Sequence, residues 1–370
     1  MDDTKSKGLV KFDSLSLRHG GMYATNGHAL YRSRNVIMDC IAKLLDCDKV
    51  SRALITVADI GTADGSTSLS LLNDIISEIR KYPGESRQIL ICYTDQPGND
   101  FNRLFNVIHG ETGLRRDPKV FYSVIGRTMY EQCLPDSSAD LIFSSIAAMA
   151  LSKSHCCFVN GVSPLYASED ELVPYKAKVT LDWKTFLLKR AKELRPGGYL
   201  VVLNIGTTKQ GEIPIHIEGG MATLGHILKT LVVDGLITKD EFMECNIGYE
   251  MFRTEDDHAL PFKENDNELL EIGLELVSTR SFVHKMSHAS FAITKKDDVT
   301  KKAYADRIIA GIKPWFHDSI YKGMSCTRSQ QERECLVNTY FQRLWEFAYS
   351  HNNQIPQMAL VEIVARKRYE

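Results

Sequence analysis

Short apolar runs rich in β-branched residues alternate with stretches of helical period from residue 53 to about residue 206. This alternation is typical of βα units around a mostly parallel sheet, and it constrains the fold more than any other feature of the chain. Five runs have the composition of buried strands, and together they predict one doubly wound α/β domain. The runs cover residues 54–58, 89–93, 120–124, 141–143 and 199–203.

The segment between the first two runs has apolar residues at spacings of three and four, from Leu69 to Ile79. This spacing predicts an amphipathic helix that crosses over between two parallel strands. Tyr82, Pro83 and Gly84 follow. Because Pro and Gly stop helices, we expect the helix to end near them.

The pattern changes after residue 206, where glycines and a proline interrupt it. Four later stretches have helical character, and residues 282–294 resemble a strand that returns to the sheet. The acidic residues 255–257 are interpreted as a solvated loop. The helical stretches are residues 224–233, 239–245, 301–312 and 332–350. The predicted parts of the chain are a lid or substrate segment at residues 1–50, a core at 51–206, and a cap built from insertions at 207–370.

Charge balance and cysteine usage limit the partners and location of the chain. The 45 Lys and Arg against 47 Asp and Glu give a formal net charge of −2, so no overall basic field favours nucleic acid or an anionic membrane. Nine scattered cysteines without a C-x-x-C pair indicate reduced thiols in the cytoplasm rather than a disulfide framework. No apolar segment reaches membrane-spanning length, and the first residues do not resemble a secretory signal.

Two histidines have a spacing that is found in metal sites. His284 and His288 are four residues apart, but their surroundings alternate like a strand, where such side chains share a face without converging. We therefore predict no metal ion.

Residues 59–65, Asp-Ile-Gly-Thr-Ala-Asp-Gly, follow the first predicted strand and open the first helix. This position is the carboxyl edge of the sheet, where doubly wound folds bind their ligands. Gly61 and Gly65 would let the backbone approach a ligand, although glycine also serves simple packing in a tight turn. The spacing matches neither the dinucleotide fingerprint nor the phosphate-binding loop, which disfavours a nicotinamide-dependent dehydrogenase.

The second predicted strand ends at Asp95, within the sequence Thr-Asp-Gln-Pro-Gly-Asn-Asp-Phe-Asn at residues 94–102. A carboxylate at this strand end is placed to accept hydrogen bonds from both ribose hydroxyls of an adenosine, while a solvated turn aspartate is the alternative. Further along, Arg-Pro-Gly-Gly at residues 195–198 closes a helix before the last strong strand.

Together these features resemble class I S-adenosylmethionine-dependent methyltransferases, and most closely the SABATH family of salicylate, jasmonate and caffeine methyltransferases. Short motifs that match the family occur in family order between about residue 20 and about residue 325. The resemblance implies a Rossmann-like doubly wound sheet with a helical cap, and S-adenosyl-L-methionine as cofactor. The motifs lie at residues 23–26, 94–102, 134–138, 144–145, 246–249 and 312–315.

The resemblance also implies which residues hold the methyl donor. The N-terminal motif and the glycine turn would hold the methionine portion, the end of the second strand the ribose and adenine, and the turn after the third strand the adenine. The implied cofactor-binding residues are Tyr23, Asn26, Asp59, Gly61, Thr67, Asp95, Gln96, Arg127 and Ser144.

The acceptor side departs from the family pattern. Carboxyl methyltransferases of the family hold the acceptor carboxylate with a Gln and a Trp, and these positions fall on Leu30 and Ala150. The His that usually precedes the Trp is Met149. Because these side chains donate no hydrogen bonds, the pocket is differently oriented, wider and more apolar, or not made for a carboxylate. His28 and Tyr249 are the nearest polar candidates for substrate binding.

The resemblance predicts transfer of a methyl group to the carboxylate of a small, apolar organic acid. A carboxylate is already ionised at neutral pH, so we assign no general base and no catalytic residue. Two alternatives remain: N-methylation of a small heterocycle, which the family also performs, and a non-catalytic relative that only binds the cofactor. The predicted partner is a small-molecule acceptor, and relatives suggest a homodimer.

Overall fold

We describe the protein from a computed structural model, in which thirteen stretches of the chain are placed well enough for description. They are residues 29–46, 53–82, 87–110, 113–114, 116–152, 158, 164, 167–207, 220–245, 253–263, 268–285, 297–352 and 357–369. All statements below concern these residues.

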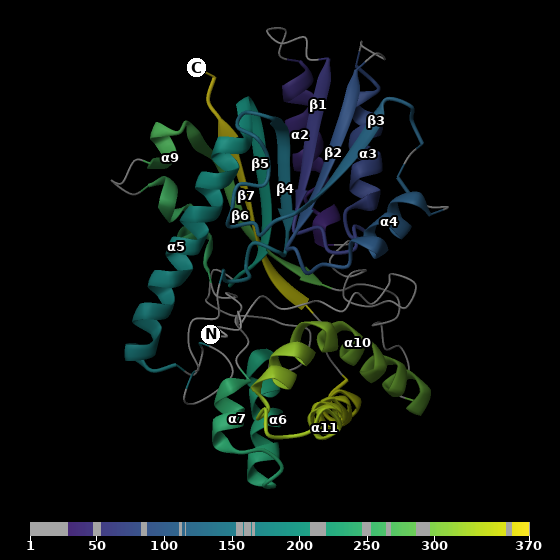
Figure 1. The fold of residues 1–370 in the computed structure, drawn as a ribbon, viewed down its shortest axis with the longest axis vertical. Helices are drawn as coiled ribbons and strands as arrows, with labels where there is room; N and C mark the ends of the chain where they lie inside the picture. The colour runs from purple at the N-terminus through teal and green to yellow at the C-terminus, as the bar shows by residue number, and fades with distance from the viewer. Residues whose placement is uncertain are drawn as a thin grey trace, which may run out of the picture.

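A seven-stranded sheet forms the centre of the described structure, in the order β3-β2-β1-β4-β5-β7-β6 (Figure 1). The first five strands along the chain are parallel, and β7 pairs antiparallel with both β5 and β6. The order reverses direction between β1 and β4, so the carboxyl ends of these two strands form the switch point of the sheet. The strands are β1 (Leu54–Ile60), β2 (Gln88–Asp95), β3 (Val120–Gly126), β4 (Ala139–Ser145), β5 (Leu194–Ile205), β6 (Leu274–Lys285) and β7 (Gln357–Lys367).

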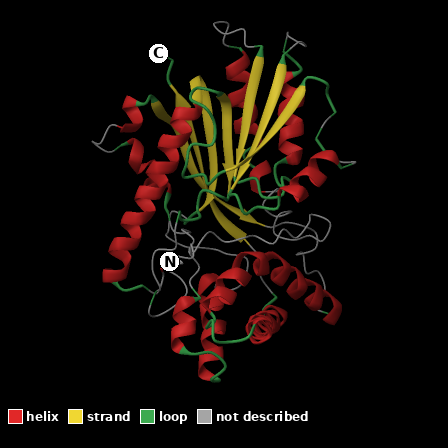
Figure 2. Ribbon diagram, viewed as in Figure 1, coloured by secondary structure: helices red, strands yellow, loops and turns green. Residues whose placement is uncertain are grey.

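Helices cover both faces of the sheet (Figure 2). One face packs on α2 (Arg34–Leu45), α3 (Leu69–Ile79) and α4 (Phe101–His109). The opposite face packs on α5 (Glu169–Glu193), η3 (Leu260–Phe262) and α9 (Glu268–Glu271). This double cover explains why the central strands are apolar on both faces.

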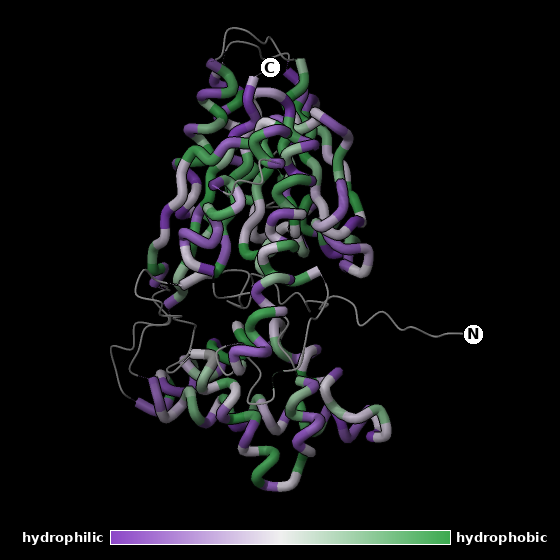
Figure 3. The backbone as a smooth tube through the Cα atoms, turned by 90° about the vertical axis from the view of Figure 1, so that its left-hand side faces the viewer, coloured by the Kyte–Doolittle hydropathy of each residue, from purple (hydrophilic) through white to green (hydrophobic). Residues whose placement is uncertain are grey.

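Four further helices form a cap beyond one end of the sheet (Figure 1, Figure 3). They share one apolar cluster with residues at the carboxyl ends of β4 and β5, among them Ile146, Leu203 and Ile205. The cap is therefore packed directly on the edge where ligands of doubly wound folds bind. The cap helices are α6 (Gly220–Val233), α7 (Lys239–Glu244), α10 (Asp298–Gly323) and α11 (Gln330–Ser350).

The structure confirms the five predicted parallel strands and the crossover helix, which ends at Ile79. The four predicted helical stretches correspond to the cap helices, although α10 is much longer than expected. The predicted strand at residues 282–294 begins earlier, at Leu274, and its second half lies outside the described residues. The final strand β7 was not predicted.

The acidic residues 255–257 are not a solvated loop, and that interpretation was wrong. They form the first turn of α8 (Glu255–Ala259). Thr254 caps this helix by accepting from the Asp257 amide, and Asp257 accepts from the Thr254 amide in return. Acidic residues are favourable at this position because the helix N-terminus carries partial positive charge.

In the parts of the chain that the structure describes, no helix is long and apolar enough to cross a membrane.

Candidate functional site

The candidate site lies at the switch point, where the turns after β1, β2 and β4 meet. The amides of Gly61 and Thr62 both donate to the carbonyl of Thr94, at 2.9 and 3.0 Å. The hydroxyl of Ser144 donates to the carbonyl of Ile60 at 2.9 Å. These bonds join the ends of β2 and β4 to the end of β1, so the edge is a fixed backbone surface.

Gly61 must be glycine for two reasons. Its φ of +80° lies in the left-handed region that side chains disfavour, and a Cβ at this position would lie 2.2 Å from the Cβ of Ala147. Gly65 has a φ of +74°, and a Cβ there would lie 2.4 Å from Leu104. Both glycines therefore bring the β1 turn into close contact with its neighbours, which is the packing role that the sequence left open.

Asp95 anchors the glycine turn as well as ending β2. Its carboxylate accepts from the amide of Ala63 and from its own neighbour Gln96, both at 2.7 Å. Asn99 adds a bond from its side-chain amide to the carbonyl of Ala63, also at 2.7 Å. A carboxylate offers about four lone-pair positions, so Asp95 retains acceptor capacity after these two bonds. Burial raises the pKa of this carboxyl above its ordinary value.

Asp59 is a second carboxylate in the same place, and it is buried, with 3% of its surface exposed. Burial raises its pKa to about 6, and the nearby charge of Asp95 acts in the same direction. The hydroxyl of Ser68 donates to Asp59 at 2.5 Å and opposes that rise. A buried and a half-buried carboxylate close together form a site that favours a cation, because a positive charge would stabilise the ionised form of both.

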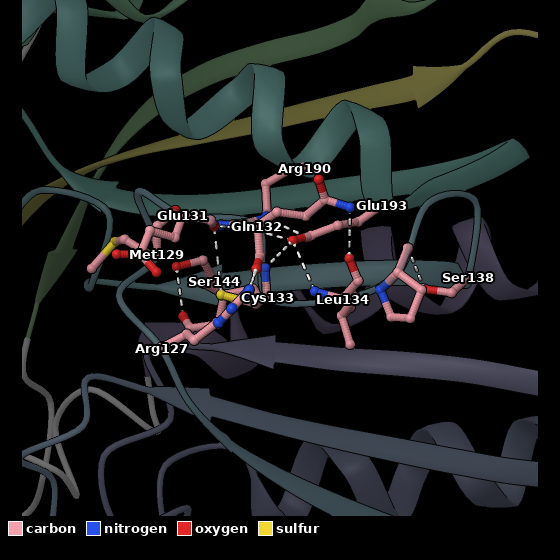
Figure 4. A network of polar contacts seen from close by, with 12 residues as sticks. Arg127, Met129, Glu131, Gln132, Cys133, Leu134, Ser138, Ser144, Arg190 and Glu193 are labelled. Carbon is pink, nitrogen blue, oxygen red and sulfur yellow. Dashed lines mark hydrogen bonds and ion pairs between the residues drawn. The ribbon is translucent and has the colours of Figure 1, made fainter.

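The remaining cofactor candidates occupy less distinctive places. Thr67 is partly buried in the turn before α3, and Gln96 is partly buried beside Asp95. The guanidinium of Arg127 donates to the carbonyl of Gln132 at 2.7 Å, within the segment between β3 and β4 (Figure 4). Tyr23 and Asn26 lie outside the described residues. Their role as cofactor-binding residues stays a prediction, as it does for the rest of the set.

The predicted acceptor residues are only partly brought together. Met149 is buried, Ala150 is partly buried, and both belong to the apolar cluster that the cap covers. Leu30 is also buried but belongs to the cluster on the α2 and α3 face of the sheet. His28 and Tyr249 lie outside the described residues. Their role in substrate binding stays a prediction.

Ile146 introduces a local irregularity between the donor edge and the acceptor cluster. Its φ of +54° is rare for a β-branched residue, and its amide donates to the carbonyl of Leu203 at 2.6 Å. The neighbouring Ser145 hydroxyl is buried and has no hydrogen-bond partner among the residues that the structure describes. Strained backbone and unsatisfied buried groups concentrate at functional sites, so this strand end is a candidate boundary between donor and acceptor.

Several residues at the site were not found by sequence reasoning. Ser68 bonds to Asp59, Tyr130 donates its hydroxyl to the Ala150 carbonyl, and Arg190 pairs with Glu193 beneath the β3–β4 segment. The position of Ser68 in the first turn after a glycine motif offered a weak signal. The other contacts depend on packing between distant parts of the chain and leave no local signal.

A separate cleft of about 430 Å³ lies between α5 and α9. Its lining mixes charges of both signs and includes neither the glycine turn nor Asp95. It is therefore not part of the candidate site. The described residues contain no cluster of three His, Cys, Asp or Glu side chains that suits a metal ion.

Comparison with known families agrees with this geometry. The sequence model of the family described as SAM dependent carboxyl methyltransferase matches residues 23–259, more than half of the chain. The chain belongs to this family. The match includes the glycine turn, the end of β2 and the whole β3–β4 segment.

Curated relatives resemble the chain over part of its length. A benzoic acid/salicylic acid carboxyl methyltransferase of Petunia hybrida is 26% identical over 207 residues, which cover 52% of this chain and 57% of that protein. The salicylate carboxymethyltransferase of Clarkia breweri is 27% identical over 216 residues, covering 56% and 59%. The chain thus matches less than two thirds of the length of either relative.

A solved structure resembles the chain over nearly its full length. Loganic acid methyltransferase with SAH has a TM-score of 0.73 at 17% identity, covering 96% of this chain and 98% of that one. At this identity the likeness shows the fold, which is the class I Rossmann-like methyltransferase fold.

Proposed function

We propose that this protein is an S-adenosylmethionine-dependent methyltransferase that converts the carboxylate of a small, apolar organic acid to its methyl ester. Family membership supports the reaction class, and the names of the two plant relatives support a carboxylic acid as acceptor. The observation that carries the proposal is the buried carboxylate of Asp59 and the half-buried carboxylate of Asp95, beside a left-handed glycine at the switch point.

The residues at this edge fit the proposed donor. Asp95 retains acceptor positions for two ribose hydroxyls, and Gln96 stands beside it. Gly61 keeps the β1 turn free of a side chain. Asp59 supplies negative charge for the cationic methionine portion, and Ser144 lies beside it at the end of β4. The donor set therefore combines hydroxyl acceptors with countercharge, which an adenosyl sulfonium requires.

When bound, the donor supplies an electrophilic methyl group on a positively charged sulfur. The acceptor carboxylate is ionised at neutral pH, so no side chain of the chain has to remove a proton. The task left to the protein is to hold both partners in line and to exclude water. Correct alignment contributes up to about 7–11 kcal/mol in the best cases, which explains how a site without a general base still catalyses.

The acceptor side indicates an apolar acid. Met149 and Ala150 bring no side-chain hydrogen-bond donor, and they lie in the cluster covered by the cap. Ala150 is also far smaller than the Trp that the resemblance places there. A larger apolar body therefore fits this side better than a small aromatic acid does.

Two measurements test the proposed function. Calorimetry should show binding of S-adenosylmethionine and S-adenosylhomocysteine to the purified full chain. A panel of fatty, terpenoid and aromatic acids, together with purine-like amines, should then be offered with a donor carrying a labelled methyl group. Base-labile label on apolar acids supports the proposal. Label on amines alone would instead support N-methylation, and donor binding without any transfer would support a non-catalytic relative.

We also propose a cytoplasmic location and a homodimer. Among the described cysteines, Cys40, Cys92, Cys133 and Cys245 are buried free thiols, which suits a reducing compartment. The dimer is supported by the resemblance to the family alone. Sedimentation equilibrium tests it, since the mass of a single subunit would contradict it.

A further inference from the structure

The connection between β3 and β4 carries no helix, although parallel strands are usually joined through one. Residues 127–138 instead run back along the sheet as an irregular segment with turns at residues 129–130 and 136–137. Met129, Tyr130, Cys133 and Leu134 pack there against the cluster that also holds Ala58, Ile60 and Trp183. Such a segment lacks the internal hydrogen bonds of a helix, so its buried backbone groups need other partners.

Arg190 and Glu193 at the end of α5 supply those partners (Figure 4). The guanidinium of Arg190 donates to the carbonyls of Met129 at 2.7 Å and Glu131 at 2.9 Å. One carboxylate oxygen of Glu193 accepts from the amides of Cys133 at 2.6 Å and Leu134 at 3.1 Å. Two ionised side chains thereby satisfy four backbone groups of one segment.

The two side chains are fully buried and hold each other in place. Neither has any exposed surface, and Arg190 Nε lies 2.6 Å from Glu193 Oε2. A second bond joins Arg190 Nη2 to Glu193 Oε1 at 2.7 Å. A buried pair with this bidentate geometry has one low-energy arrangement, so the segment it holds is rigid.

The segment begins beside the residues proposed to hold the adenosine. Gly126 at the end of β3 pairs in register with Asp95. A Cβ on Gly126 would lie 3.6 Å from the Cα of Pro97 and 3.4 Å from the ring of Phe101. Residues 127–130 therefore continue directly from the wall of the proposed ribose site towards the carbonyls that Arg190 binds.

We infer that Arg190 and Glu193 are positioning residues that hold residues 129–134 and thereby fix the start of the segment, residues 127–130, as the adenine-side wall of the donor site. The inference rests on the proposed function. The pair acts through the backbone of the segment and contacts no reacting atom. A rigid wall distinguishes adenine from other purines by the hydrogen bonds that the edge of each base makes with it. When the wall or the base edge changes, a polar group is left buried without its partner, and that ligand binds more weakly.

The test compares two ligands in two variants by calorimetry on the full chain. The ligands are S-adenosylhomocysteine and S-inosylhomocysteine, in which an oxygen replaces the 6-amino group of adenine. Arg190→Lys keeps the charge opposite Glu193 but cannot reach both carbonyls. We expect the preference for the adenine ligand to fall by about tenfold, the equivalent of one lost buried hydrogen bond.

A matched control exists in the cap. Arg328 pairs with Glu241 at 2.6 Å and donates to the carbonyl of Leu236, while Glu241 accepts from the amide of Ser325. Arg328→Lys disrupts the same kind of contact away from the sheet edge and should leave the ligand preference unchanged. An equal fall in both variants, or an unchanged preference in folded Arg190→Lys, would overturn the inference.

If Arg190→Lys does not fold, hydrogen exchange on the unaltered protein tests the inference instead. The amides of Cys133 and Leu134 should exchange as slowly as those of β1 without any ligand, and exchange at the rate of an open loop would overturn the inference. If the unaltered protein binds neither ligand, the proposed function fails. If it binds both equally, the donor site stands and the adenine wall is wrong.

Discussion

The two sides of the candidate site differ in polarity. The donor side is polar and fixed by bonds between side chains and backbone: Asp95 ties the β2 end to the β1 turn, and Ser144 ties β4 to the end of β1. The acceptor side is apolar, with Met149 and Ala150 packed towards the cap. A donor of constant shape and charge requires a fixed polar site, whereas acceptors differ between relatives. Under the proposed function, the sheet edge would determine the reaction class and the cap would determine the choice of acceptor.

The largest effect should follow from adding one methyl group to the glycine turn of the donor side. Gly61→Ala adds a Cβ that would lie 2.2 Å from Ala147 and leaves it in a left-handed conformation. Overpacking and backbone strain together cost about 2–4 kcal/mol in the folded protein. The turn relieves this strain by moving away from Ala147, which displaces the proposed donor contacts, so donor affinity should fall by about 100-fold. Calorimetry and thermal unfolding measure it.

Gly235→Ala is the matched control. Gly235 has a φ of +69° with nothing within 4 Å of an added Cβ. The Gly235→Ala variant should lose about 1 kcal/mol of stability from backbone strain and keep the donor affinity of the unaltered protein. Equal loss of affinity in the two variants would mean that the contact with Ala147 is irrelevant to the donor site.

The second effect separates the donor side from the acceptor side. Asp95→Ala removes the acceptor for the ribose and for the Ala63 amide, and should weaken donor binding by about 1–3 kcal/mol. The KM for the acceptor should stay within about twofold, because the substitution weakens binding of the donor and leaves the acceptor side unchanged. Unchanged donor affinity would contradict the assignment of Asp95.

Asp59 should give the donor side a pH dependence that the acceptor side lacks. Its pKa of about 6 means that it is largely protonated below pH 6, so affinity for a cationic donor should fall by up to about tenfold per pH unit there. Asp59→Asn should bind the donor weakly at every pH. Calorimetry between pH 5 and pH 8 would contradict the role of Asp59 if the two proteins showed the same profile.

The same carboxyl has the opposite effect on folding. Because its pKa is raised from the ordinary 3.8, the folded state binds the proton more tightly than the unfolded state. Its contribution to stability therefore falls as pH rises from about 4 to about 6, by on the order of 2–3 kcal/mol. Asp59→Asn should unfold at a higher temperature than the unaltered protein at pH 7, and a lower temperature would refute the shift.

The smallest effect should come from the acceptor side. Ala150→Trp restores the aromatic donor that the family resemblance places there, and should lower the KM for benzoate by about three- to tenfold if the cavity is only enlarged. Leu30→Gln is its partner change, but Leu30 lies in a different apolar cluster. Alone, it should chiefly reduce stability by burying an amide. No gain for the double variant would indicate a different orientation of the acceptor.

Strand prediction succeeded where burial on both faces imposes a continuous apolar run. Four of the five parallel strands, β1, β2, β4 and β5, meet this condition. β3 lies at the edge of the sheet and is half-exposed, with Phe121 48% exposed, so the prediction of a buried strand there was right about the strand and wrong about its burial. β7 was missed although residues 358–361 are apolar, because Glu362 interrupts the run. The structure buries that carboxylate at 2% exposure against Arg280, at 2.6 Å. Arg280 is itself half-exposed, and an ion pair that buries one carboxylate between strands distant in sequence has no local signature.

Prediction of the site residues was limited in the same way, because the sequence reveals only local features. Gly61 and Asp95 were found because turn chemistry and strand ends are local features, and the structure brings them together at one edge. The link between Ser68 and Asp59 requires the first turn of α3 to fold back on β1. Arg190 and Glu193 are three residues apart on a helix and resemble an ordinary surface pair in the sequence. Only packing of the β3–β4 segment distinguishes them.

β6 reaches the sheet only through β7, which lies between it and β5 although it comes last of the three along the chain. A ribosome therefore presents β6 and the cap helices before it has made the strand that joins them to the core. During that interval both flanking edges stay unpaired, and open edges invite aggregation. The pairing of β5 and β6 with β7 therefore has to wait until the cap helices between β6 and β7 have been synthesised.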